Sequence, residues 1–197
     1  MRNMTVDITF KRDGKTLYKG STFAGFTTIF NGVKRERFAM SLNQRLTENV
    51  DDAIRNILMW AMGLRHASPV LTLTRRLFED DRISNDYESA KEYLETESLV
   101  SPIYLILGAG APSDKDGCII TRAVDKSVAP LMLDRGTSWL LETNYDHWEA
   151  PPADDDRRTP GNHCMKVGIF ELFLSKDGIN SMCPKSVSSS SSLLLSF

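Results

Sequence analysis

The chain has 197 residues, and 41% of them are hydrophobic, so it can bury one sizeable core. Its 24 Lys and Arg residues and 26 Asp and Glu residues leave a formal net charge of −2, without a long basic stretch. This balance argues against nucleic acid as a partner. Three cysteines without a C-x-x-C pair, and three histidines without ligand spacing, argue against a zinc site, and no metal or other cofactor is expected.

The first residues, Met1 to Asp7, lead directly into an alternating strand pattern and contain no apolar core, so we do not expect a signal peptide in this sequence. No run approaches the ~20 apolar residues that span a bilayer. The sequence as it stands therefore points to a cytosolic or undetermined location.

The N-terminal part is predicted to form a β-hairpin. Three hydrophobic residues alternate with polar ones before the turn, namely Val6, Ile8 and Phe10. Asp13-Gly14 suits the positive φ angles of a tight turn, and Leu17 and Tyr18 continue the pattern after it. Two further strands are expected over 23–30 and 38–42, joined through a basic turn at 34–37.

Helical periodicity begins after Asn49. One apolar stripe, expected to face the core, consists of Ile54, Ile57, Leu58, Ala61 and Leu64. Asp51 and Asp52 fall in the first turn, where the helix dipole favours carboxylates.

Two more helices are expected next. One starts at Pro69 with Ser68 as its cap, and the other follows Ser84-Asn85. Their buried positions are predicted to be Val70, Leu73, Leu77, Tyr87, Ala90 and Leu94.

Strands return over 102–108, 117–123, 130–134 and 138–144. Strands, then helices, then strands indicate an α+β fold rather than a parallel βαβ sheet. We expect one domain over 1–175. Residues 176–197, which include a nearly pure serine run at 186–192, are predicted to be a disordered tail, because such a segment buries too little apolar surface to offset its ordering entropy.

The most informative motif is the segment 143–148, TNYDHW, followed by Arg157-Arg158-Thr159-Pro160. It places the Asn144 amide at the end of a predicted strand and supplies the Arg157 guanidinium from the next element. Such a pair can stabilise negative charge on a carbonyl oxygen during acyl transfer. An ordinary turn is the alternative, since Asn and Asp are common turn residues.

Several segments in this order resemble the large subunit of the acid ceramidase family and its relative, N-acylethanolamine-hydrolysing acid amidase. They are STFAGF (21–26), SLNQR (41–45), PIYLILG (102–108), GCIITR (117–122), TNYDHW (143–148) and DDRRTP (155–160). The similarity spans about residues 5–166. SLNQR favours the ceramidases, whereas His147 is associated with the amidase.

The resemblance implies the αββα sandwich of N-terminal-nucleophile hydrolases, here incomplete at both ends, and a lysosomal location for the family. It also implies catalysis by an N-terminal cysteine, with Asn144 stabilising the oxyanion and Arg157 holding the site together. Gln44 occupies a position where the family has Glu, so its role is in doubt. No cysteine precedes Cys118, so the family nucleophile is absent from these residues and the chain alone is expected to be inactive or nearly so.

The remaining candidates have simpler interpretations. Cys118 lies in an apolar strand and is expected to be a buried, inert thiol. Cys164 matches a family cysteine that would bridge to the small subunit of the same precursor, a bond that this chain could not make within itself. The acidic run 154–156 is expected to be a solvated loop neutralised by the arginines that follow it.

Three hypotheses follow. The first is a ceramidase-like amide hydrolase that converts N-acylsphingosine (ceramide) to a fatty acid and sphingosine, with an N-acylethanolamine amidase as the alternative. The second is a truncated, non-catalytic isoform that keeps a lipid- or subunit-binding surface. The third is a truncated product without a stable fold, because a missing central strand would expose unpaired edges.

Overall fold

A computed structural model of the chain describes residues 4–45, 50–110, 117–133 and 139–165, and the backbone of 194–196. Within these residues, one antiparallel sheet contains seven strands in sequence order. They are β1 (Thr5–Arg12), β2 (Lys15–Phe23), β3 (Asn31–Lys34), β4 (Phe38–Gln44), β5 (Ile103–Ala109), β6 (Gly117–Arg122) and β7 (Leu131–Met132).

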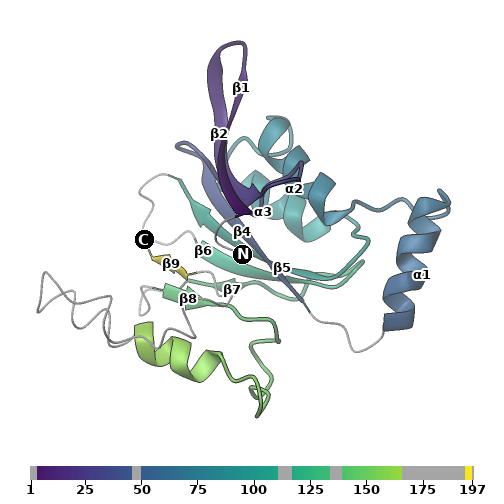
Figure 1. Cartoon of the computed structure of the whole chain (residues 1–197), viewed down its shortest axis with the longest axis vertical. Coiled ribbons are helices and arrows are strands. Elements are labelled where there is room, and N and C mark those ends of the chain that lie inside the picture. Colours follow the sequence, from purple (N-terminus) through teal and green to yellow (C-terminus); the bar gives the residue numbers. More distant parts are fainter. Residues whose placement is uncertain (1–3, 46–49, 111–116, 134–138, 166–193, 197) are drawn as a thin grey trace, which may run out of the picture.

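The other elements form layers on the two faces of this sheet. Three helices connect β4 to β5, namely α1 (Val50–Ala61), α2 (Val70–Glu79) and α3 (Tyr87–Thr96). After the sheet come β8 (Trp139–Leu141), which pairs with β9 (Leu194–Ser196), and a helical stretch over 158–165. Figure 1 shows α2 and α3 on one side of the sheet, with β8, β9 and the last helix on the other. This arrangement confirms the predicted α+β class and is consistent with an αββα sandwich.

The two faces of the central strands differ in character. Alternate side chains of a strand point to opposite faces. Phe38 and Met40 of β4 and Leu105 of β5 belong to the apolar core, together with residues of α2 and α3. The opposite face of the same strands carries Asn43, paired in register with Tyr104, and both are buried. One face therefore holds the core, and the other presents polar side chains to the β8 layer.

The predicted hairpin is present. Asp13 and Gly14 have φ angles of 52° and 76°, as a two-residue turn between right-twisted strands requires. Phe10 and Tyr18 stack with ring centroids 4.2 Å apart. The turn at 34–37 also forms, with Glu36 at a φ of 61° between β3 and β4.

The strand predicted over 23–30 is wrong. β2 ends at Phe23, and the chain then turns through Gly25 at a φ of 94°, with the Phe26 N–H donating to the Phe23 carbonyl. The next strand starts only at Asn31. The hydrophobic residues that suggested a strand pack against one another instead, since the rings of Phe23 and Phe30 lie 5.4 Å apart.

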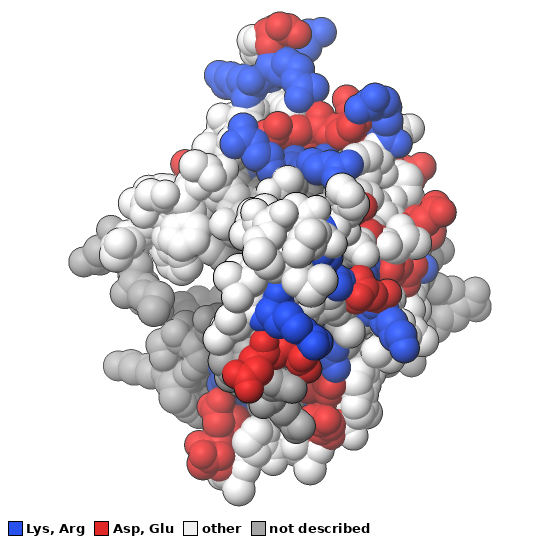
Figure 2. Space-filling model, turned by 90° about the vertical axis from the view of Figure 1, so that its right-hand side faces the viewer, with Lys and Arg blue, Asp and Glu red and all other residues white. Residues whose placement is uncertain are grey.

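The helix predicted after Asn49 forms, but its apolar stripe does not face the core. Ile54, Ile57, Leu58 and Leu64 are 51%, 49%, 54% and 67% exposed. α1 lies at the side of the sheet rather than over it (Figure 1). Figure 2, which faces this side, shows an uncharged area at its centre. The expectation of a buried stripe is therefore corrected for the described part of the chain.

The next two helices bury the predicted faces, although their caps differ from the prediction. Leu73, Leu77 and Leu94 are 0% exposed. The N-cap of α2 is Pro69, because the Ser68 hydroxyl donates to the Glu97 carboxylate instead of capping the helix. α3 is capped by Asp86, which accepts from the Ser89 N–H in a capping box.

Most of the predicted disordered tail lies outside the described residues. Within it, Leu194–Ser196 form β9, which pairs with β8. Among the helices of the described residues, none has the length and apolar character to cross a bilayer.

Candidate active site

The structure brings the predicted pair into direct contact. The Arg157 Nη1 donates to the Asn144 Oδ1 at 2.7 Å. Because a guanidinium only donates, the amide oxygen of Asn144 must face it, which fixes the orientation of the carboxamide. The amide nitrogen therefore points the other way, toward the end of β4.

The end of β4 receives that nitrogen. The Asn144 Nδ2 donates to the Asn43 Oδ1 at 2.9 Å and to the Gln44 carbonyl at 2.8 Å. The Asn43 Nδ2 in turn donates to the Thr143 carbonyl at 2.9 Å. We call Asn43, Asn144 and Arg157 the interlock. It joins the end of β4 to the loop after β8, about 100 residues further along the sequence.

The interlock has a chemical consequence. Both N–H groups of the Asn144 amide are already donated, so one must be redirected before it can bind an oxyanion. The weaker of the two restraints is the bond to the Gln44 carbonyl, which lies at an exposed strand end. Gln44 thus takes part through its backbone, while its side chain is exposed.

A second tether lies beside the interlock. The Arg45 Nε and Nη2 donate to the two Asp146 oxygens at 2.8 and 2.6 Å, and the Tyr104 hydroxyl donates to Asp146 Oδ1 at 2.6 Å. Burial alone would raise the pKa of Asp146, but the hydrogen bonds from Arg45 and Tyr104 outweigh it and hold this pKa below its usual value. Burial, reinforced by Asp146, raises the pKa of Tyr104. Asp146 is therefore held as a carboxylate.

The loop after the motif is folded back by Tyr145 and Arg158. The backbone N–H groups of Arg157 and Arg158 donate to the Tyr145 hydroxyl oxygen at 3.2 and 2.8 Å. Arg158 also lies over the Tyr145 ring, 4.6 Å from its centroid. Asp155 pairs with Arg157 at 2.6 Å, which agrees with local ion pairing in the acidic loop. The described residues contain no group of acidic, His or Cys residues suited to a metal ion.

Comparison with known proteins shows which proteins the chain is similar to. No protein-family model matches the sequence. Acid ceramidase of Heterocephalus glaber is 35% identical over 168 residues, which are 84% of this chain and 41% of that protein. The human enzyme is 35% identical over 167 residues, 84% of this chain and 40% of that protein. The mouse enzyme is 34% identical over 193 residues, 92% of this chain and 47% of that protein.

The chain is homologous to the acid ceramidases. It spans less than half the length of these relatives, since it covers 40–47% of each. A solved structure, the Caenorhabditis elegans ortholog of N-acylethanolamine-hydrolyzing acid amidase, matches 96% of this chain and 75% of its own, with a TM-score of 0.67 and 26% identity. Both branches of the predicted resemblance are therefore found among its relatives.

The two cysteines within the described residues are in unreactive states. Cys118 is 1% exposed, and burial raises its pKa to about 11, which confirms the prediction of an inert thiol. Cys164 is disulfide-bonded.

Two buried titratable groups adjoin the motif. Glu142 is 2% exposed, and burial raises its pKa to about 7, although its Oε1 accepts from the Thr143 N–H at 2.8 Å. Its Oε2 finds no partner among the described residues. Burial and the nearby Arg158 lower the pKa of His147. The carboxyl group of Glu142, directly before the segment 143–148, is therefore neutral under acidic conditions.

A cavity of about 630 Å³ opens beside the interlock, between α1 and the loop after β8. We call it the α1 cavity; its polar lining includes Asp52, Asn56, Tyr104, Asn144, Tyr145 and Glu149. Pro102 and Val124 contribute apolar surface. Asn144, a residue of the interlock, is part of the lining of this cavity.

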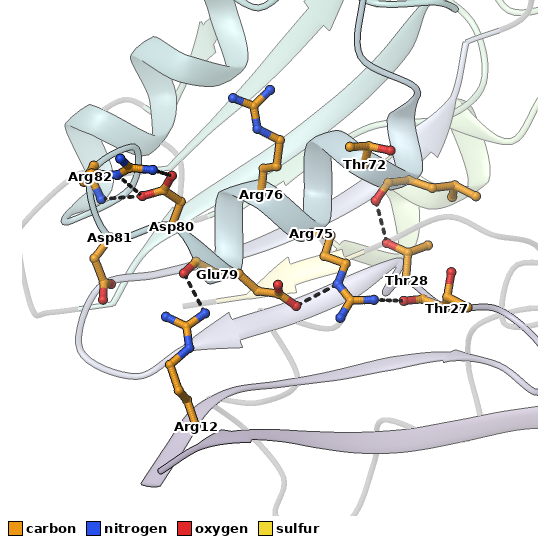
Figure 3. A pocket seen from close by; sticks show the side chains of 11 residues that line it. Arg12, Thr27, Thr28, Thr72, Arg75, Arg76, Glu79, Asp80, Asp81 and Arg82 are labelled. Atoms are coloured by element: carbon orange, nitrogen blue, oxygen red, sulfur yellow. Dashed lines mark hydrogen bonds and ion pairs between the residues drawn. The ribbon is translucent and has the colours of Figure 1, made fainter. Parts of the chain in front are cut away.

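A second cavity, of about 680 Å³, lies between the β1–β2 hairpin and α2 and is shown in Figure 3. Its charged side chains satisfy one another. Arg12 donates to the Glu79 carbonyl, Arg75 pairs with the Glu79 carboxylate at 2.8 Å, and Arg82 pairs with Asp80 at 2.7 Å (Figure 3). These contacts hold the hairpin against α2, so we read this cavity as structural.

Proposed function

We propose that this chain forms the electrostatic half of a ceramidase-like amide hydrolase that cleaves an N-acylated lipid amine, such as N-acylsphingosine, into a fatty acid and an amine. The observation that carries the proposal is the contact between Arg157 and Asn144 at the end of β4. The homology to acid ceramidases supports the substrate class.

In this reaction a thiolate adds to the amide carbonyl carbon, and the π electron pair moves onto the oxygen. The Asn144 amide, turned from the Gln44 carbonyl toward that oxygen, stabilises the negative charge. Arg157 keeps the carboxamide oriented and contributes positive charge nearby. Donors of this kind contribute about 10²–10³-fold to the rate. The C–N bond then breaks, the nitrogen takes a proton, and water hydrolyses the thioester.

The attacking thiol is proposed to come from outside the described residues. Burial keeps Cys118 protonated, and Cys164 has no thiol while it is disulfide-bonded. We therefore expect the described part of the chain by itself to hydrolyse amides at most slowly. A non-catalytic isoform is the second candidate function, and the state of these two cysteines favours it.

Partner and compartment are also part of the proposal. The exposed apolar stripe of α1 supports a further subunit that covers it. We propose a lysosomal site of action, which the similarity to acid ceramidases supports. It is supported by Glu142, because acid conditions neutralise this buried carboxyl group.

The test is an assay of the full-length gene product with labelled ceramide and labelled N-acylethanolamine. Preferential turnover of ceramide is expected. Preferential turnover of N-acylethanolamine would instead indicate an amidase. The similarity to the C. elegans structure and the presence of His147 favour this alternative. Turnover of neither by a soluble, folded protein would contradict the hydrolase and support the non-catalytic isoform.

A further inference from the structure

The backbone that carries Asn144 is anchored on both sides of this residue. Before it, the Thr143 carbonyl accepts from the Asn43 Nδ2 at 2.9 Å. After it, the Asp146 carboxylate accepts three hydrogen bonds from side chains of the sheet and its end. The proposed oxyanion donor therefore lies between two points that are fixed to the sheet.

The anchor at Asp146 depends on two side chains. Arg45 directly follows β4, and Tyr104 lies in β5 and is 0% exposed. The guanidinium carbon of Arg45 lies 5.9 Å from the centroid of the Tyr104 ring, so the two side chains form one unit around the carboxylate. The Arg45 Nη1 also donates to the carbonyl of Arg122, the last residue of β6, at 3.4 Å. The loop after β8 is thereby tied to three adjacent strands.

This anchor matters because the Asn144 amide has to turn before it can act. Its Nδ2 donates to the Asn43 Oδ1 and to the Gln44 carbonyl, and one of these bonds must be released when the amide binds an oxyanion. A rotation of the side chain brings the amide to a defined place only if the backbone stays where it is. A displacement of about 1 Å in a catalytic group can lower a rate about 10²-fold.

We propose that Tyr104 and Arg45 are positioning residues for Asn144, and that they act through the Asp146 carboxylate. They fix the backbone two residues after Asn144, whereas Asn43 and Arg157 contact its amide directly. This inference rests on the proposed function, in which Asn144 is the oxyanion donor. The alternative is a tether that only stabilises the fold.

A pair of matched variants separates the two roles. Tyr104→Phe removes one hydroxyl and keeps the ring. Tyr18→Phe is the control, because Tyr18 is 2% exposed and its hydroxyl donates to the Glu79 carboxylate at 3.1 Å in the helix-covered layer. Glu79 is also paired with an arginine, Arg75, as Asp146 is with Arg45. Both variants should therefore lower the unfolding free energy to a comparable extent.

Their effects on catalysis should differ. In ceramide hydrolysis by the full-length protein, Tyr104→Phe is expected to lower kcat about tenfold and to leave KM within about twofold. Tyr18→Phe should leave both constants within about twofold. An unchanged kcat in Tyr104→Phe, or an equal loss in the two variants, would overturn the proposal.

A double variant tests whether the effect passes through Asn144. With Asn144→Ala the amide to be positioned is gone, so adding Tyr104→Phe should change the remaining rate by less than about twofold. The same test applies to Arg45→Lys, which keeps the charge but loses the two-bond contact with Asp146. A tenfold loss in the Asn144→Ala background, as large as in the unchanged protein, would show a purely structural role and overturn the proposal.

The positioning role and the proposed function can fail separately. In the 197-residue chain, NMR should show that Tyr104→Phe shifts and broadens the side-chain amide resonances of Asn144, while Tyr18→Phe leaves them in place. If these resonances respond in this way but the full-length protein hydrolyses no amide, the positioning stands and the hydrolase is wrong. If ceramide is hydrolysed while neither kcat nor the resonances respond to Tyr104→Phe, the positioning is wrong and the hydrolase stands.

Discussion

The two faces of the central strands perform different tasks with the same backbone. The helix-covered face of β4 and β5 holds Met40 and Leu105, which are 1% and 0% exposed and belong to the apolar core. The opposite face holds Asn43 and Tyr104, whose polar atoms bond to the loop after β8. Because alternate residues of a strand point to opposite faces, the residues that stabilise the core and the residues that build the site lie on different faces of the same strands. Mutations on each face should separate them as well.

The largest stability effect is expected on the apolar face. Leu105→Ala removes three buried carbons at the centre of the core, and such changes destabilise by about 2–5 kcal/mol. Urea unfolding of the full chain measures it. The control is Leu71→Ala on the outer side of α2, where the side chain is 40% exposed and the change should be below about 1 kcal/mol. Equal effects at both sites would contradict the assigned core.

The tether on the polar face should contribute less. Asp146→Asn leaves the guanidinium of Arg45 half-satisfied in a site where the two side chains are 18% and 12% exposed. We expect a loss of roughly 1–3 kcal/mol in unfolding free energy. Arg82→Gln is the comparison, because Arg82 is 89% exposed in its ion pair and should matter by less than about 0.5 kcal/mol.

The buried carboxyl group of Glu142 should make the free energy of unfolding depend on pH. Its folded-state pKa of about 7 lies above the ordinary value of 4.5, so the folded chain keeps a proton that the unfolded chain loses. Folding is therefore penalised as pH rises from about 4.5 to 7, and the penalty is complete above 7. Unfolding at pH 5 and pH 8 measures this penalty. Glu142→Gln should reduce the difference in unfolding free energy between the two pH values by on the order of 1–3 kcal/mol. An unchanged slope would contradict the burial of Glu142.

The smallest effect is expected on α1, outside both faces. Leu58→Gln replaces a side chain that is 54% exposed, so the unfolding free energy should move by less than about 0.5 kcal/mol. The same replacement at Leu77 of α2, which is 0% exposed, should cost several times more. A large effect at Leu58 would mean that the stripe is covered in solution.

This contrast between helices also shows what the sequence could predict. Apolar periodicity correctly predicted α1, α2 and α3, but it carries no information about which partner covers a stripe. The Asp13-Gly14 turn was predictable because its conformation is set locally. The segment 23–30 was not, because its hydrophobic residues pack around a turn at Gly25 rather than along a strand.

The site was only partly predictable. Asn144 and Arg157 were predicted from motifs that resemble a known family, and the structure shows that the two side chains are in contact. Arg45, Tyr104 and Asp146 were missed, since their contacts join the end of β4 and β5 to a loop far along the chain, and local patterns do not show such contacts. Their one sequence signal was spacing, because Arg45 and Asp146 each lie two residues after an asparagine of the interlock.

The central claim is that Asn144 and Arg157 act as one unit on the reacting carbonyl. Its most direct test is the single-turnover rate of ceramide hydrolysis by the full-length protein with Asn144→Asp, Arg157→Lys and both changes. The account predicts that each single change lowers the rate about 10²–10³-fold and that the double change is no worse than the poorer single one. Full activity of Asn144→Asp, or losses that multiply in the double variant, would contradict it.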